Sequence, residues 1–302
     1  MAVTNLRDEE TLLLHAVQQA RQSGAKIVLL HIARTGSSTL VHGRAAKKPE
    51  GALSIREARS ELDRMARQLR WVGIRCEAVF LKDPREEDIQ QLAKSRGADR
   101  VLVSLQAAGA EEASDQAAML DKLLPILHVP VCIIGEKVLP FSQKQRPAGR
   151  ITLAISLSSD CEIPLKFASR LAQEQHAQLT VMHVFSGGSR NVTRINEAPA
   201  AVASRLPENA LREAQLFCPL EIAVREGDPA DELLNFAAST NQDFIILGSP
   251  GSPGGSGGAG IVHRIVSEAL CPVILLSQAV SDPAQSLEDL AALPRPPQGV
   301  RT

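Results

Sequence analysis

The feature that most constrains this chain is an internal repeat. Each half carries a helical pattern that leads to a short apolar run with a histidine near its end, Ile27–Ile32 and Leu179–Val184. Each half also closes with an apolar run entered through proline, Val131–Ile134 and Val273–Leu276. Five such matches occur in the same order, about 142 to 152 residues apart, which chance would hardly produce.

The repeated signals between these runs predict strands that alternate with helices. The 3.6-residue period of apolar positions predicts helices, and the short β-rich runs are typical of buried parallel strands. The further matches are helices near 52–72 and 200–217, strands at 76–81 and 220–224, Asp-Pro helix starts at 83–84 and 228–229, and strands at 99–103 and 243–247. Because βαβ crossovers are right-handed, the order predicts parallel sheets covered by helices on both faces.

Linker composition divides the chain into two domains, residues 1–138 and 149–278, joined by a polar, proline-containing segment. Residues 279–302 are rich in proline and lack an apolar pattern, so we expect a disordered tail. The first domain offers only Met1–Thr4 where the second has the full strand Arg150–Ile155. Either its start lies upstream or its first strand is stunted.

Composition excludes several classes of function. A net charge of −1, no tyrosine and one tryptophan give no basis for nucleic-acid binding. No apolar run approaches the ~18 residues of a membrane span, and Met1–Thr11 lacks an apolar signal core. The five cysteines form no CxxC pair, which favours buried thiols in a reducing compartment over a metal site. We therefore expect a cytoplasmic protein without nucleic-acid or membrane partners.

The end of the second half carries the most specific motif. A strand ends in Leu247-Gly248-Ser249-Pro250-Gly251, a glycine-rich loop and a helix follow, and the last strand opens with Cys271-Pro272-Val273-Ile274. Together with the element order, this motif resembles the universal stress protein family in its tandem two-domain form, over about residues 1–278. The resemblance implies an α/β fold with a five-stranded parallel sheet in each domain, of the Rossmann-like, adenine nucleotide alpha hydrolase-like class.

The resemblance also implies a nucleotide site in the second domain. Glycines let the backbone approach phosphate, and free N–H groups at a helix start attract anions. The implied cofactor is ATP, with Mg²⁺ accompanying it. The corresponding residues are Ala154, Ser156, Val184, Leu247, Gly248, Gly251, Ala259, Gly260 and Ile261. Ser156 stands where the family has a carboxylate, and Ala259-Gly260 stands where it has Gly-Ser or Gly-Thr.

Two interpretations of the glycine-rich loop stay open: a phosphate cradle, or a degenerate loop. At the equivalent positions the first half has Val103-Ser104-Leu105-Gln106-Ala107, without the early glycines. We therefore expect that the first domain does not bind nucleotide. His31 and His183 are either acid–base groups or structural histidines at a strand end, and we favour the structural role. Asp228 fits a helix N-cap better than a catalytic base.

These features lead to a non-catalytic stress-response or signalling protein that binds ATP through its second domain. The alternatives are a nucleotide-free scaffold, and a nucleotide hydrolase or adenylyl-transfer enzyme. The enzyme reading lacks a visible base, metal carboxylates or nucleophile. Because a lone domain would leave its last strand as an apolar edge, we expect self-association or a pseudo-dimer within the chain, beside an unknown protein partner.

Overall fold

A computed structural model gives the fold of the chain. It describes residues 2–4, 10–33, 54–105, 122, 124–138, 149–157, 160–185, 199–248 and 258–276. Residues 139–148, 249–257 and 277–302 lie outside these ranges, and with them the predicted linker, most of the glycine-rich loop and the predicted tail.

The first half alternates strands and helices as the repeat predicts. Its elements are β1 (Ala2–Thr4), α1 (Glu10–Ser23), β2 (Ile27–Ala33), α2 (Ile55–Trp71), β3 (Cys76–Lys82), α3 (Glu86–Ser95), β4 (Val101–Ser104) and β5 (Val131–Ile134). Those of the second half are β6 (Gly149–Ile155), α5 (Glu162–Glu174), β7 (Ala177–Phe185), α7 (Glu208–Phe217), β8 (Leu220–Glu226), α8 (Pro229–Ser239), β9 (Phe244–Leu247), α9 (Gly258–Glu268) and β10 (Val273–Leu275).

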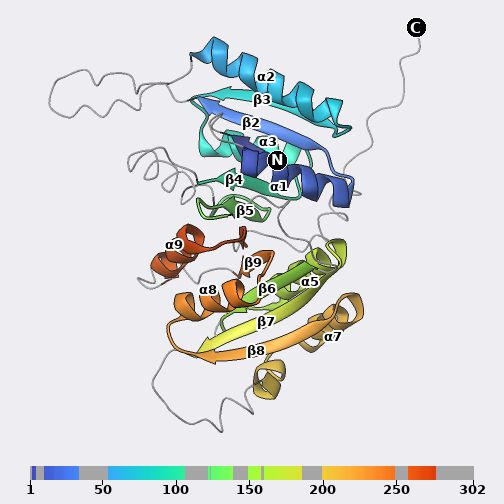
Figure 1. Cartoon of the computed structure of the whole chain (residues 1–302), viewed down its shortest axis with the longest axis vertical. Coiled ribbons are helices and arrows are strands. Elements are labelled where there is room, and N and C mark those ends of the chain that lie inside the picture. The colour runs from blue at the N-terminus through green and yellow to red at the C-terminus, as the bar shows by residue number, and fades with distance from the viewer. Residues whose placement is uncertain are drawn as a thin grey trace, which may run out of the picture.

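The ten strands of the described residues form one continuous sheet, in the order β3-β2-β1-β4-β5-β10-β9-β6-β7-β8. In Figure 1 the strands follow one another in this order from top to bottom. Within each half every pairing is parallel, whereas β5 and β10 pair antiparallel at the centre. The two predicted five-stranded sheets are therefore present and fuse edge to edge, which confirms the expected pseudo-dimer.

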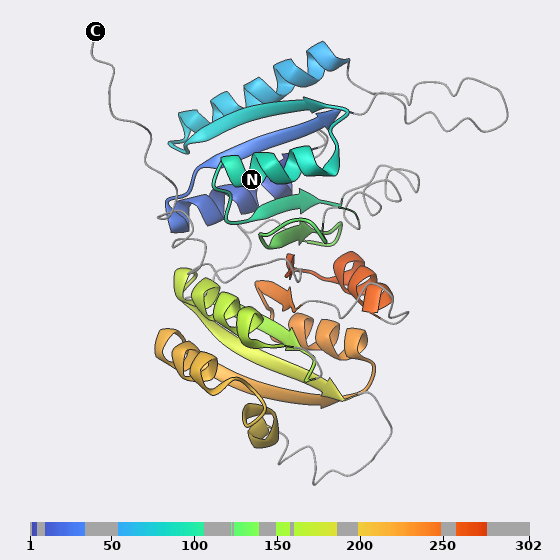
Figure 2. The same cartoon turned by 180° about the vertical axis from the view of Figure 1, so that it is seen from behind.

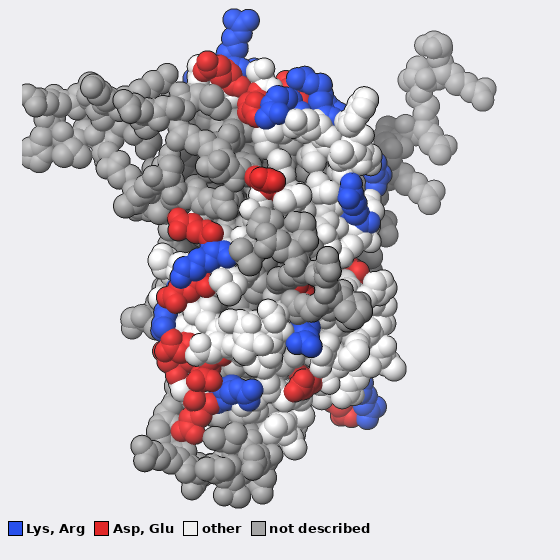
Figure 3. Space-filling view, in the orientation of Figure 1, with Lys and Arg blue, Asp and Glu red and all other residues white. Residues whose placement is uncertain are grey.

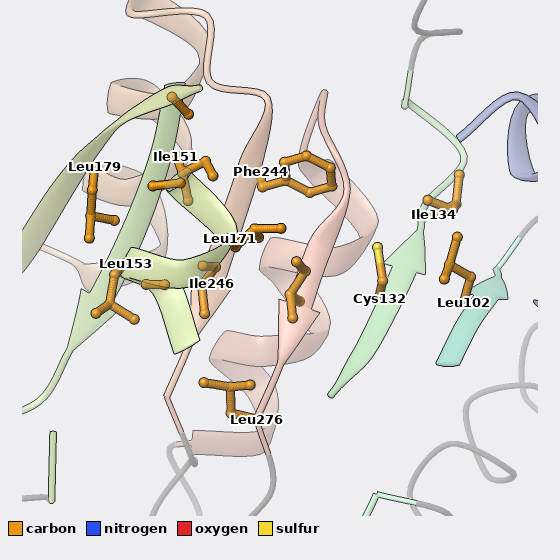
Figure 4. Close-up of a cluster of buried hydrophobic side chains, with 14 of the residues drawn as sticks. Leu102, Cys132, Ile134, Ile151, Leu153, Leu171, Leu179, Phe244, Ile246 and Leu276 are labelled. Atoms are coloured by element: carbon orange, nitrogen blue, oxygen red, sulfur yellow. The ribbon is translucent and has the colours of Figure 1, made fainter. Parts of the chain in front are cut away.

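Helices cover both faces of this sheet (Figures 1 and 2). On one face α1, α2, α5 and α7 pack on a buried cluster that includes Leu102, Cys132 and Ile274. On the other face α3, α8 and α9 pack on a second cluster. Each cluster runs through both halves, and Figure 4 shows residues of the first one on either side of the β5–β10 pair. The fold therefore has two cores, separated by the sheet rather than by the domain boundary.

A pseudo-two-fold axis passes through the central strand pair. Pro130 and Pro272 enter the last strands of the two halves and lie 142 positions apart (272 − 130), so Cys132 and Ile274 are equivalent. These two residues lie directly opposite each other in the antiparallel pairing. Because both cores keep the same face in each half, the axis is perpendicular to the sheet.

One helix start differs from its prediction. Asp228 is the N-cap of α8, and its Oδ1 accepts from the N–H groups of Ala230 and Asp231 at 3.1 and 3.0 Å, as predicted. Asp83 is not an N-cap: it has a left-handed φ of 47°, and α3 starts at Glu86 after the N-cap Arg85. The Asp88 carboxylate accepts from the Arg85 N–H at 2.8 Å, so a residue inside the helix satisfies its first turn.

Candidate functional site

The point at which the strand order reverses lies between β6 and β9 in the second half. From β6 the chain moves outward through β7 to β8, then returns across β6 to β9 and β10. In open parallel sheets, ligands bind at the carboxyl ends of strands at such a switch point. The predicted site residues Ala154 and Leu247 are directly paired here, at the ends of β6 and β9.

The neighbouring site residues collect at the same edge. Ser156 follows β6 and is exposed, whereas Val184 on β7 is half-buried. Since Ile155 pairs with His183, Val184 lies level with Ser156 on the adjacent strand. The structure thus brings together Ala154, Ser156, Val184 and Leu247. They surround one hydroxyl with small and apolar side chains, and such a surface suits the uncharged adenosine part of a ligand better than a charged part.

Gly248 ends β9 for a reason that the sequence did not reveal. A Cβ at this position would lie 3.3 Å from Cγ of Pro164, in the first turn of α5, and 3.9 Å from the Ala154 carbonyl oxygen. The glycine therefore allows α5 to pack tightly against the end of β9. This close packing keeps the carboxyl edge compact, and it gives Gly248 a structural role whether or not a phosphate binds.

The start of α9 provides the anion-binding feature. The helix begins at Gly258, so its first backbone N–H groups, including that of Gly260, have no partner within the helix. Gly260 is exposed, with open space where a Cβ would stand, and Ile261 is half-buried. For Ala259 the structure describes only the helical backbone, and Gly251 lies outside the described residues.

His183 ties β7 to β6. Its Nδ1 lies 3.0 Å from the Ile155 carbonyl oxygen, and its ring meets Phe185 edge-on with centroids 4.6 Å apart. Beside it, the Cys161 thiol donates to the Ser156 carbonyl oxygen at 3.5 Å, and burial raises the pKa of this thiol. These contacts give both side chains a structural role at the strand ends.

Arg264, on the second turn of α9, is the cation that sequence reasoning missed. Its guanidinium binds Asp228 at 3.2 Å, Asp231, and Glu268 at 3.5 Å, and the Asp231 carboxylate leads in raising the pKa of the arginine. Along this margin of the molecule, charges of both signs alternate (Figure 3). The contacts fix α9 to α8, so the helix start is held in place from one side.

Those carboxylates do not fit a Mg²⁺ site, because Asp228 and Asp231 are already bound to Arg264. Among the described residues no group of three or more His, Cys, Asp or Glu side chains could hold a metal ion. In the first half, Lys122 stands 142 positions before Arg264 (264 − 122) and pairs with Glu86 at 3.9 Å. The ion pair that joins these two elements is thus repeated in the first half. The residue equivalent to Gly248, however, is the buried Ser104.

Comparisons with known proteins agree with this architecture. A universal stress protein from Archaeoglobus fulgidus DSM 4304 has a similar structure, with a TM-score of 0.59 and 15% identity, over 91% of this chain and 96% of that one. A functionally unknown protein from Pseudomonas aeruginosa PAO1 gives a TM-score of 0.57 and 18% identity, over 96% and 95%. At these identities the likeness shows the fold alone, and no curated protein matches the chain.

The part of the chain that the structure describes contains no helix long and apolar enough to cross a membrane. The model of the universal stress protein family matches twice, over residues 1–113 and 147–277, and the two matches cover both halves of the sheet. The chain therefore belongs to the universal stress protein family, with two family domains in tandem.

Proposed function

We propose that the protein is a cytoplasmic, non-catalytic stress-response protein that binds one ATP, with Mg²⁺, through its second domain. The observation that supports this proposal most is the meeting of Ala154, Ser156 and Gly248 at the switch point, on the edge where α9 begins. Adenosine would contact the ends of β6 and β7, and the phosphates would meet the free N–H groups of the α9 start.

The expected affinity is modest. Ser156 offers a hydroxyl in place of a carboxylate, and Gly260 offers no hydroxyl to the phosphates. Each hydrogen bond lost to a polar or charged group costs roughly 0.5–3 kcal/mol, so the two together weaken binding by about one to four decades. Occupancy would then follow the nucleotide level, which suits a signalling protein that couples binding to a partner or to oligomer state.

Titration with ATP and Mg²⁺ in a calorimeter tests this function on the whole chain. We expect one molecule per chain, and no binding by Gly251→Asp, which adds bulk and negative charge beside the phosphates. Gly109→Asp, in the corresponding loop of the first half, is the matched control and should bind like the wild type. Two sites per chain would refute the asymmetry, whereas no heat and no copurified nucleotide would favour a nucleotide-free scaffold.

A further inference from the structure

Exposed apolar side chains gather at two equivalent places on the molecule. Seven large apolar residues of the described chain are exposed, and four of them lie at the ends of α2 and α7: Trp71, Val72, Leu216 and Phe217. Trp71 is 91% exposed and Leu216 is 84% exposed. Single exposed apolar residues are ordinary, but an adjacent pair at the end of the same helix in both halves is a repeated feature of the fold.

The two helices occupy equivalent positions on either side of the pseudo-two-fold axis. α2 connects β2 to β3 and α7 connects β7 to β8, and both pack on the same face of the sheet. β3 and β8 are the outermost strands, so nine strand spacings separate them, about 40 Å. Figure 1 shows α2 and α7 at opposite ends of the molecule. Trp71 and Leu216 therefore do not meet within one chain.

The charges on the two helices are opposite. α2 carries five arginines and three carboxylates, a net charge of +2, whereas α7 carries two glutamates and one arginine, a net charge of −1. Residues three or four apart share one face of a helix, so Arg67 lies beside Trp71 and Glu213 lies beside Leu216. One exposed apolar side chain thus has a cation next to it, and its counterpart has an anion.

These two neighbouring charges are available to a partner. Other charged side chains of the helices are engaged within the chain: Arg64 binds Glu61, Arg59 lies over the Phe80 ring, Arg70 donates to the Cys76 carbonyl oxygen, and Arg212 binds Glu208. In the part of the chain that the structure describes, neither Arg67 nor Glu213 forms an ion pair. Arginine beside an exposed tryptophan is typical of the residues that dominate binding surfaces.

The pseudo-two-fold axis determines how a second copy can use both surfaces at once. Because this axis is perpendicular to the sheet, the ends of α2 and α7 stand at the same height above one face. A second copy is turned over by a two-fold axis parallel to the sheet and at right angles to the line between the helix ends. Its α7 then lies on α2, and its α2 lies on α7. The same contact forms twice, which is the arrangement of a closed, isologous interface.

We propose that two copies of this chain form a dimer in which the end of α2 of each copy packs on the end of α7 of the other. Trp71 covers Leu216 and Phe217 of the second copy, and Arg67 pairs with Glu213 of the second copy. The apolar residues supply affinity, and the charges select the pairing, because contact between two α2 helices would bring two net positive surfaces together. Both helix ends lie at the amino ends of β3 and β8, so the dimer does not rest on the proposed nucleotide site.

The fluorescence of Trp71 tests the proposal directly on the full chain. Trp71 is the single tryptophan of a chain without tyrosine, so the emission reports on this one contact. Dilution should shift the emission to the red as the dimer dissociates and the indole meets water, in step with the loss of mass in sedimentation equilibrium. An emission of exposed tryptophan, with the mass of a monomer at every concentration, would overturn the proposal.

A substitution at the far end of the same chain separates this dimer from any other. Leu216→Asp should weaken dimerisation on the order of tenfold to a hundredfold and shift the Trp71 emission to the red at equal concentration. Because Leu216 is so exposed, the fold should be unaffected, which circular dichroism checks. Gln91→Asp, exposed on α3 of the other face, adds the same charge and should change neither reading. A dimer that keeps its mass and emission in Leu216→Asp uses another surface, and this result would also overturn the proposal.

Exchange of the charges tests the orientation. Arg67→Glu and Glu213→Arg should each weaken the dimer on the order of tenfold, because each places like charges together at both contacts. The double variant restores opposite charges and should recover most of the wild-type affinity. Losses that simply add in the double variant would show that Arg67 and Glu213 do not face each other, and would contradict the pairing of α2 with α7.

Discussion

The two halves share one fold but differ in chemistry where they meet. Near the axis the second half presents Phe167, Leu171 and Phe244, and the equivalent positions of the first half are His15, Gln19 and Arg100. Gln19 and Arg100 line a cleft at the amino ends of β2 and β4, whereas Leu171 and Phe244 lie in the apolar core beside β6. The first half thus holds polar side chains where the second half holds apolar ones, because a cleft admits water to these groups.

Arg100 connects the two halves through contacts with α5. Its guanidinium lies 3.6 Å from Glu174 and 5.8 Å from the centroid of Phe167, both on α5 of the second half. The equivalent residue of the second half, Phe244, is instead buried in the apolar core. The junction is therefore asymmetric although the strands that form it are related by a pseudo-two-fold axis.

The largest effect is expected from truncating the equivalent residues Phe244 and Arg100. Phe244→Ala should lower the free energy of unfolding by about 3–5 kcal/mol, because Phe244 is only 1% exposed and its truncation leaves a cavity in the core. Arg100→Ala should cost less, about 1–2 kcal/mol, because it removes polar contacts to Gln19 and Glu174 rather than a buried aromatic ring. Urea denaturation of both variants measures the difference, and equal losses would show that the two positions contribute equally to stability despite their different chemistry.

A second test compares two glycines. A Cβ at Gly135, just after β5, would collide with the Val266 carbonyl oxygen on α9 of the other half, whereas Gly260 has open space. Gly135→Ala should therefore destabilise the chain by about 1–3 kcal/mol, through strain that the α9 backbone must absorb. Gly260→Ala should be neutral or stabilise the chain by up to about 1 kcal/mol, from helix propensity. Thermal unfolding ranks the two, and the reverse order would contradict the tight junction.

The smallest effect is expected at the outer strands. Glu77 binds Lys26 and Arg96, and hydrogen bonds from these cations, Lys26 first, lower the pKa of the carboxyl. In the second half the equivalent pair is Gln178 and Glu221, whose atoms Nε2 and Oε2 are 3.3 Å apart. Glu77→Gln should cost under about 1 kcal/mol at neutral pH, because the groups are partly exposed.

The pH dependence follows from the sign of this shift. A lowered folded-state pKa contributes stability above the unfolded value, near 4.5. That contribution disappears as the pH falls through the folded value, so the variant and the wild type should converge in acid. Unfolding measured between neutral pH and about pH 3 checks this, with Glu221→Gln, whose neighbour Gln178 carries no charge, as the control. A Glu77 effect that persists in acid would rule out the ion pairs as its source.

Local patterns predicted the fold well because each signal is strong and repeated. The strand runs around Leu29, Val181 and Ile246 fall within observed strands, and β1 lies within Met1–Thr4, for which an upstream start and a stunted strand were both left open. The prediction of an N-cap at Asp83 was wrong. The helix starts later, after Arg85, and the carboxylate of Asp88 accepts the Arg85 N–H. Such competition between neighbouring caps is invisible without backbone angles.

The site was only partly predictable. The switch point follows from the element order, so Ala154, Ser156, Val184, Leu247 and Gly248 could be placed together. The packing of Gly248 on Pro164 and the binding of Arg264 to Asp228 depend on how α5, α8 and α9 sit on the sheet. Sequence spacing carries no information on these distances, since the partners lie 84 (248 − 164) and 36 (264 − 228) positions apart.

The pairing of Cys132 with Ile274 on the axis bears on how such a chain evolves. In a dimer of identical subunits a residue on the axis faces its own copy, so every mutation there occurs twice at one contact. Fusion into a single chain removes that doubling. A thiol can then face a branched alkyl group, and each half can accept changes that would be intolerable as a symmetric pair, which frees one domain to diverge while the other keeps its ancestral chemistry.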